Sequence, residues 1–186
     1  MLDLLDAFRQ DQRKTRYETI DELDDYCRRS ANPVGHLLLE MAGCRKKVGD
    51  ERSDAICTAL QLANHLQDTR RDFEAGRIYL PNEVWQRHAV SESDFVPGET
   101  SANLRAAIEE ESRRARQLFD EGASLPTDVP RWLATDLEMF IAGGRATLDA
   151  IEAIGFDVMR VRPTVSKWKQ ARLLGGVLVR RYSPFG

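Results

Sequence analysis

Apolar residues recur at helix-type spacing along nearly the whole chain, and no stretch alternates apolar and polar residues in the way typical of a β-strand. Residues that begin or end helices stand between these stretches: Thr19 with Glu22 matches a capping box, Ser101 is an N-cap candidate, and Gly76 is a candidate left-handed cap. The predicted helices cover residues 19–27, 34–41, 51–75, 81–85, 101–122, 130–142 and 145–154, with a last helix after residue 163. The sequence predicts an all-α fold, with residues 1–186 forming a single helical domain.

The composition excludes several classes of protein. Of the 186 residues, 42% are hydrophobic and 31% charged, which is typical of a globular chain. No uncharged apolar run approaches the roughly 20 residues needed to cross a bilayer, and residues 1–12 carry acidic side chains, unlike a signal peptide. The net charge of −3 argues against a general nucleic-acid binder. The three cysteines contain no C-x-x-C pair, so we expect a reduced, cytoplasmic protein with neither a disulfide framework nor a thiolate zinc site.

Many familiar catalytic motifs are absent from the sequence. There is no P-loop, no dinucleotide-binding glycine motif, no G-x-S-x-G and no H-E-x-x-H. The histidines His36, His65 and His88 are scattered, and none follows a glutamate by three residues as in a di-iron bundle. We expect each of them to be a surface histidine or one with a satisfied hydrogen bond.

The predicted helix 51–75 carries a polar stripe. Gln61, Asn64, Asp68 and Asp72 are spaced three, four and four residues apart, so they lie within about 80° of one helix face. One interpretation is the solvated face of an amphipathic helix. The other is a site for a hard cation such as Mg²⁺, because the stripe consists of short oxygen-bearing groups, and two aspartates one turn apart repel each other unless a cation or base lies between them.

A second motif, Gly76-Arg-Ile-Tyr-Leu-Pro81, follows this stripe. Arg77 could bind an anion near the aspartates, since a guanidinium matches phosphate oxygens in bidentate fashion. Alternatively, Arg77 pairs with a surface carboxylate and Tyr79 simply packs.

Together these motifs resemble the squalene and phytoene synthase family. The second aspartate-rich motif of that family resembles Gln61-Leu-Ala-Asn64-x-x-x-Asp68-x-x-x-Asp72 with the following Gly76–Pro81 motif. Its tyrosine-cysteine segment resembles Tyr17-Glu-Thr-x-x-Glu-Leu with Tyr26-Cys27 and Pro33-Val-Gly35. Within the family, the motif Ala31-Asn-Pro-Val-Gly35 is most similar to that of the bacterial hydroxysqualene synthases of hopanoid biosynthesis. Phytoene synthases more often carry a glutamate where this chain has Arg71.

The resemblance implies a prenyl synthase-like helical bundle around an apolar cavity, with Mg²⁺ bridging a substrate diphosphate to aspartates on facing helices. It implies that Asn64, Asp68 and Asp72 are metal ligands and that Gln61 is a polar group of the cavity wall. Tyr26 would lie near the reacting carbons, and Arg77 would help to hold diphosphate.

The expected reaction converts presqualene diphosphate to hydroxysqualene with loss of diphosphate. The alternatives are phytoene or squalene synthesis, for which farnesyl diphosphate is also a candidate substrate, and a truncated, non-catalytic partner subunit that contacts pathway enzymes. A generic helical scaffold with an accidental polar stripe is a further alternative. The absence of a nucleotide-binding loop favours capture of water over reduction by NADPH.

The first aspartate-rich motif of the family has no counterpart here. Upstream of Tyr17, where the tyrosine-cysteine segment begins, the chain has Asp3, Asp6 and Asp11, but not the expected Asp-x-x-x-Asp pair in its helical context. We therefore expect the chain to correspond to the C-terminal two-thirds of a synthase, as a fragment, the product of a misplaced start codon or half of a split gene. We also expect it to be poorly active or inactive alone and to expose apolar surface where the first helices would pack.

The end of the chain is basic. Residues 160–186 contain seven basic side chains and no acidic one, whereas the remainder has a net charge of −10. In the predicted last helix, Lys169, Arg172 and Arg180 lie on one side, and the apolar residues Ala171, Leu174, Val177 and Leu178 lie on the other. Such a helix could make peripheral contact with an anionic membrane, or it could pack on the core with a solvated charged face.

Overall fold

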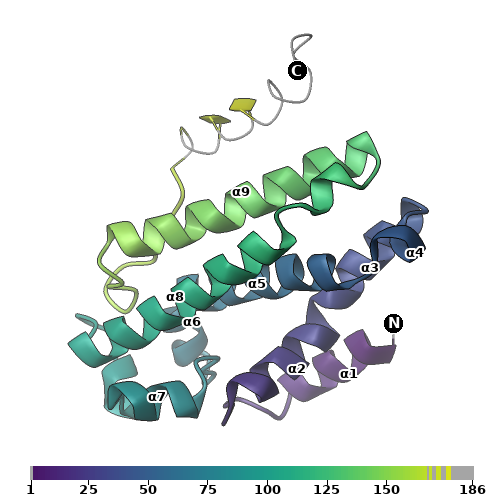
Figure 1. Ribbon diagram of the computed structural model, residues 1–186. Coiled ribbons are helices and arrows are strands. Elements are labelled where there is room, and N and C mark those ends of the chain that lie inside the picture. The colour runs from purple at the N-terminus through teal and green to yellow at the C-terminus, as the bar shows by residue number, and fades with distance from the viewer. Residues whose placement is uncertain (1, 167, 169–170, 173–174, 177–186) are drawn as a thin grey trace.

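The computed structural model of the protein describes residues 2–166, 168, 171–172 and 175–176, and all regular secondary structure in this part is helical (Figure 1). The helices are α1 (Leu2–Asp11), α2 (Ile20–Ser30), α3 (Asn32–Met41), α4 (Arg45–Val48), α5 (Glu51–Gln67), α6 (Thr69–Glu74), α7 (Asn82–His88), α8 (Ala102–Gly122) and α9 (Arg131–Ala153). Two 3₁₀ turns, η1 (Glu92–Phe95) and η2 (Leu125–Thr127), flank α8. The predicted all-α fold is confirmed.

The centre of the fold is α5, which packs against α2, α3, α8 and α9. Figure 1 shows α8 and α9 side by side over α5, with α1 and α2 at the edge away from α9. The inward faces of α5, α8 and α9 form most of the core, with Ala59, Leu62, Ala63, Leu104, Ile108, Ala115, Phe119, Leu148 and Ile151 all buried. Contacts with four helices hold α5 in place, and α5 carries Gln61 and Asn64, the first two residues of the polar stripe.

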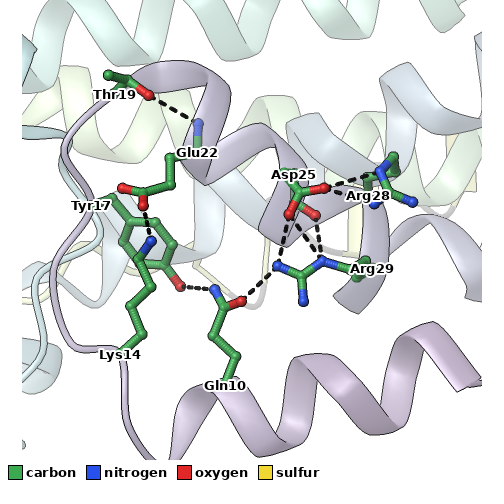
Figure 2. A network of polar contacts seen from close by, with 8 residues as sticks. All are labelled: Gln10, Lys14, Tyr17, Thr19, Glu22, Asp25, Arg28 and Arg29. Carbon is green, nitrogen blue, oxygen red and sulfur yellow. Dashed lines mark hydrogen bonds and ion pairs between the residues drawn. The ribbon is translucent and has the colours of Figure 1, made fainter.

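A polar network fastens α1 and the following segment to α2 (Figure 2). The Gln10 side chain accepts a hydrogen bond from Arg29 at 2.6 Å and donates one to the Tyr17 hydroxyl at 3.3 Å. Lys14 forms an ion pair with Glu22 and also lies 5.0 Å from the centre of the Tyr17 ring. These contacts fix the position of Tyr17, which is 2% exposed.

The predicted helix starts are largely confirmed. The Thr19 hydroxyl accepts a hydrogen bond from the backbone N–H of Glu22, and Ser101 accepts one from Leu104. The capping box at Thr19 is only half formed, because the Glu22 carboxylate accepts from the backbone N–H of Glu18 instead of that of Thr19.

Two predicted helix boundaries are wrong. The helix predicted over residues 51–75 is interrupted at Asp68, where the Thr69 hydroxyl donates to the backbone carbonyls of His65 and Leu66 and competes with regular helix bonding. Conversely, residues 130–142 and 145–154 belong to one helix, α9. Gly144 lies where α9 packs closest, since a Cβ atom there would come within 2.2 Å of Phe119. Gly144 therefore permits close packing, a Cβ atom at Gly143 would meet no atom within 4 Å, and the pair does not end a helix.

Apolar side chains are exposed on α1, α3 and α9. The sequence predicts exposed apolar surface on this chain. The exposed side chains include Leu2, Leu5, Phe8, Val34, Leu37, Met41, Trp132 and Phe140. The predicted basic helix after residue 163 lies largely outside the described residues. Within the described part, no helix is both long and apolar enough to pass through a bilayer.

Candidate active site

The polar stripe crosses the junction between α5 and α6. Asp68 is the single residue between the two helices, yet its backbone N–H still donates to Asn64 at 2.9 Å, and that of Asp72 donates to Asp68 at 2.9 Å. Because these i to i−4 bonds continue through the junction, Gln61, Asn64, Asp68 and Asp72 keep a common face. Asn64 is exposed, and the other three are half-buried.

Asp68 is held by guanidinium groups. Arg162, from the segment after α9, donates through Nε to Oδ1 at 2.6 Å and through Nη2 to Oδ2 at 3.2 Å. Arg71 is a further ion-pair partner at 3.5 Å. The hydrogen bond from Arg162 is the main cause that holds the pKa of Asp68 below its usual value. Asp68 is therefore a carboxylate that stays ionised and attracts positive charge.

Asp72 is in the opposite electrostatic state. Burial raises the pKa of its carboxyl from 3.8 to about 6; Arg77 lowers this pKa, and the neighbouring charge of Asp68 raises it further. The backbone N–H of Arg77 donates to the backbone carbonyl of Asp72 at 2.8 Å, which places the two residues together. The Nε atom of Arg77 is buried and has no hydrogen-bond partner within the described part of the chain. Arg77 thus lies beside Asp72, and its guanidinium retains donor capacity.

Tyr26 lies in a buried cluster of aromatic rings. It is 4% exposed, and its ring centre is 5.6 Å from Tyr17, 5.8 Å from Tyr79 and 6.3 Å from His65. His65 and Tyr79 stack at 3.7 Å. Burial is the main cause that raises the pKa of the Tyr26 hydroxyl, and the carboxylate of Asp11 raises it further, so this hydroxyl remains a neutral polar group.

The expectation for His65 is wrong. Its ring is buried, and Nε2 has no hydrogen-bond partner among the described residues. Burial lowers the pKa of His65 to about 3, so the ring is neutral at physiological pH. The sequence did place His65 next to Asn64, but its spacing gave no sign that Tyr79, 14 residues later, would stack on it.

Hollows lie on two sides of the stripe. A small cavity of about 20 Å³ has room for one water molecule; its lining combines apolar side chains with the polar residues His65, Thr69, Asp72, Tyr79 and Glu111. On the other side, an apolar groove of about 240 Å³ runs between α3, α5 and α9 and is lined by Leu38, Ile56, Cys57, Leu60, Leu137 and Phe140. A further hollow of about 320 Å³, which shares Leu60 and Phe140 with this groove, reaches Asn64. The groove and this hollow therefore lie next to each other, and of the stripe residues the hollow contacts Asn64.

Comparison with known proteins gives this arrangement a context. The sequence model of the family described as squalene/phytoene synthase matches residues 1–169. The chain belongs to the squalene/phytoene synthase family. It is 41% identical over 129 residues to a hydroxysqualene synthase of Zymomonas mobilis, which covers 69% of this chain and 43% of that protein. It is 32% identical over 178 residues to a chloroplastic phytoene synthase of Daucus carota, which covers 90% of this chain and 44% of the other.

A solved relative in the squalene/phytoene synthase family has the same fold. The structure of squalene synthase HpnC from Alicyclobacillus acidocaldarius matches with a TM-score of 0.81 and 44% identity, over 84% of this chain and 59% of that one. The present chain thus spans less than half the length of the curated family members above and about three-fifths of the solved one. The predicted family and its isoprenoid synthase fold are confirmed.

The stripe residues of this family member fit a hard divalent cation. No cluster of three His, Cys, Asp or Glu side chains suited to a metal occurs within the described residues. Mg²⁺ does not need one, because it is usually held by one or two carboxylates and completed by water and phosphate oxygens. Asp68 already attracts cationic groups, and Asp72 is a half-buried carboxylate with no hydrogen-bond partner among the described side chains. Both properties suit residues that face a cation.

Proposed function

We propose that this chain carries part of the active site of a Mg²⁺-dependent synthase that converts presqualene diphosphate to hydroxysqualene. The observation that carries the proposal is that the carboxylates of Asp68 and Asp72 share a helix face with Asn64, which lines the hollow beside the apolar groove. The similarity to hydroxysqualene synthases, at 36–41% identity over 129 residues, supports this product. In the reaction, the carbon–oxygen bond to diphosphate breaks, water supplies a hydroxyl to the carbon skeleton, and its proton leaves with diphosphate.

The polar stripe would bind the diphosphate end of the substrate. Asn64, Asp68 and Asp72 would hold Mg²⁺, which supplies neutralisation of the charge on the departing diphosphate. Arg77 would donate to diphosphate oxygens through its guanidinium, whose Nε has no hydrogen-bond partner among the described residues. Gln61 would contribute a polar group to the cavity wall one turn from Asn64.

The apolar groove would bind the hydrocarbon end. Leu60 and Phe140 line both hollows and would exclude stray water from a cationic intermediate. Tyr26 would supply a neutral hydroxyl near the reacting carbons, because its raised pKa keeps the proton in place. His65 is neutral as well, so neither group adds a charge that would attract or repel the cationic intermediate.

The test is turnover of presqualene diphosphate with Mg²⁺. The 186-residue chain and a form extended through the upstream reading frame would be compared, each with Asp68→Ala and Asp72→Ala variants. We expect the extended form to release pyrophosphate and form hydroxysqualene, the variants to lose this activity, and the 186-residue chain to be poorly active. If no form turns over any prenyl diphosphate, the non-catalytic partner subunit takes the place of this proposal.

Phytoene synthesis is a second candidate function. Chloroplastic and cyanobacterial phytoene synthases match at 28–32% identity over 90–93% of this chain, further along its length than the hydroxysqualene synthases do. Supplying the extended form with geranylgeranyl, farnesyl and presqualene diphosphates in parallel decides between the products.

The basic end of the chain would give peripheral contact with membranes that hold the apolar product and with other pathway enzymes. Deleting residues 160–186 should abolish co-sedimentation with anionic liposomes; unchanged co-sedimentation would remove this part of the proposal.

A further inference from the structure

The segment after α9 crosses the α5–α6 junction. The Gln67 side chain donates to the backbone carbonyl of Pro163 at 2.8 Å, and Arg162 donates to the Gln67 side-chain oxygen at 3.2 Å. Arg162 also reaches both carboxylate oxygens of Asp68, at 2.6 and 3.2 Å. Further along the segment, Val165 lines the hollow that contains Asn64. We call residues 160–166 the strap.

The strap uses the same oxygen atoms that a cation would need. A guanidinium that binds both oxygens of a carboxylate leaves little of that carboxylate for a metal ion. Through Val165, the strap also forms one wall of the hollow that leads to the stripe. The strap therefore lies both at the Asp68 carboxylate that a cation would contact and at the hollow that contains Asn64.

We propose that Arg162 is a latch: it occupies Asp68 in the metal-free protein and must be displaced when a divalent cation binds. This inference rests on the proposed function, because it concerns the same aspartate. The latch adds a regulatory step, in which binding of the cation releases the strap from the α5–α6 junction.

The exposure of the pair makes the latch reversible. The side chain of Arg162 is 42% exposed and that of Asp68 is 27% exposed. An ion pair at this exposure changes an equilibrium constant by at most about fivefold, because water and salt screen the attraction. Arg162 can therefore shield Asp68 without preventing a divalent cation from replacing it.

The test measures Mg²⁺ binding by the 186-residue chain without any prenyl diphosphate, by titration calorimetry. Arg162→Gln removes the latch. Arg70→Gln is the matched control, because it removes the same charge from α6, where Arg70 pairs with Glu74 at 2.8 Å and not with Asp68. We expect Arg162→Gln to bind Mg²⁺ about three- to fivefold more tightly than Arg70→Gln. Arg162→Lys keeps the charge but not the bidentate contact, so its Mg²⁺ affinity should lie between those of the wild type and Arg162→Gln.

Hydrogen exchange gives an independent readout of the strap. In the wild type, Mg²⁺ should accelerate backbone exchange in residues 160–166, and in Arg162→Gln this exchange should be fast before Mg²⁺ is added. Equal Mg²⁺ affinities in Arg162→Gln and Arg70→Gln would overturn the latch and leave the proposed function intact. Weaker binding by Arg162→Gln would also overturn it, because Arg162 would then support the cation. Absence of Mg²⁺ binding in every variant would remove both the latch and the metal role of Asp68.

Discussion

Replacing Asp72 with asparagine should stabilise the metal-free protein at neutral pH. Burial raises the pKa of this carboxyl to about 6, and the nearby charge of Asp68 adds repulsion that Arg77 only partly offsets. An acid whose pKa is higher in the folded than in the unfolded state favours folding while it is protonated and opposes folding once it ionises. The ionised Asp72 side chain therefore opposes folding above about pH 6, and an amide of the same shape removes this opposition.

The size of the effect follows from the pKa values. A rise from 3.8 to about 6 corresponds to at most about 3 kcal/mol, at roughly 1.4 kcal/mol per pKa unit. The side chain is only half-buried, so water screens part of this penalty. We expect Asp72→Asn to raise the free energy of unfolding by about 1–2 kcal/mol at pH 8. The gain should shrink as the pH falls from 6 and vanish near pH 4.

Urea unfolding in EDTA at pH 8 and pH 4 measures this gain. Asp68→Asn is the control, because Arg162 lowers the pKa of Asp68 and the ionised form therefore favours folding. That stabilisation is present above the unfolded pKa of the carboxyl and is lost as the pH falls below it. Asp68→Asn should thus cost up to about 1 kcal/mol at pH 8. A loss of stability in Asp72→Asn at pH 8, or an equal gain at pH 4, would refute the reasoning.

Three further predictions concern the packing of α9, a buried ion pair in α8 and the cap of α2. Gly144→Ala should cost about 1–3 kcal/mol of stability by overpacking, because its Cβ would lie 2.2 Å from Phe119. Gly143→Ala, whose Cβ meets no atom within 4 Å, should gain about 0.5–1 kcal/mol. Equal urea midpoints for these two variants would contradict the described packing of α9. Arg114→Ala should cost about 3–5 kcal/mol, because it leaves the 2% exposed Glu111 without its partner at 2.9 Å, and adding Glu111→Gln should recover part of that loss in the same urea assay. Thr19→Ala should cost about 1 kcal/mol by removing the cap of α2, seen as a lower melting temperature, and Thr19→Ser should retain it.

Local sequence signals predicted most of the helices but not every boundary. The caps at Thr19 and Ser101 depend on hydrogen bonds within four residues, so the sequence contains all the information they need. The interruption at Asp68 depends on the Thr69 hydroxyl, which could equally have pointed to solvent. Continuity through Gly143 and Gly144 depends on the fit of α9 against neighbouring helices, which no local pattern contains.

The candidate site shows the same limit. The three-four-four spacing predicted which stripe residues share a face, because helix geometry alone decides that. It could not predict that Arg162, 94 residues away in the chain, would bind Asp68. Nor could it predict the buried cluster in which His65 stacks on Tyr79, because tertiary packing brings α5 together with the segment after α6. Residues that lie far apart in the sequence thus decide the electrostatic state of a locally predictable motif.

That electrostatic state bears on why the latch can open. Asp68 has a cationic partner in Arg162, whereas Asp72, one turn later, remains half-buried and destabilised when ionised. A guanidinium on Asp68 compensates one of the two negative charges, whereas Arg77 only partly offsets the cost of the other. A divalent cation between them would compensate both, so the penalty at Asp72 is recovered when Arg162 is displaced. The Arg162 ion pair is worth at most about 1 kcal/mol, so a divalent cation that contacts both carboxylates can displace the guanidinium. Asp72→Asn removes the negative charge that a divalent cation would compensate. This variant should therefore bind Mg²⁺ more weakly, and its strap should stay on Asp68 in the presence of Mg²⁺.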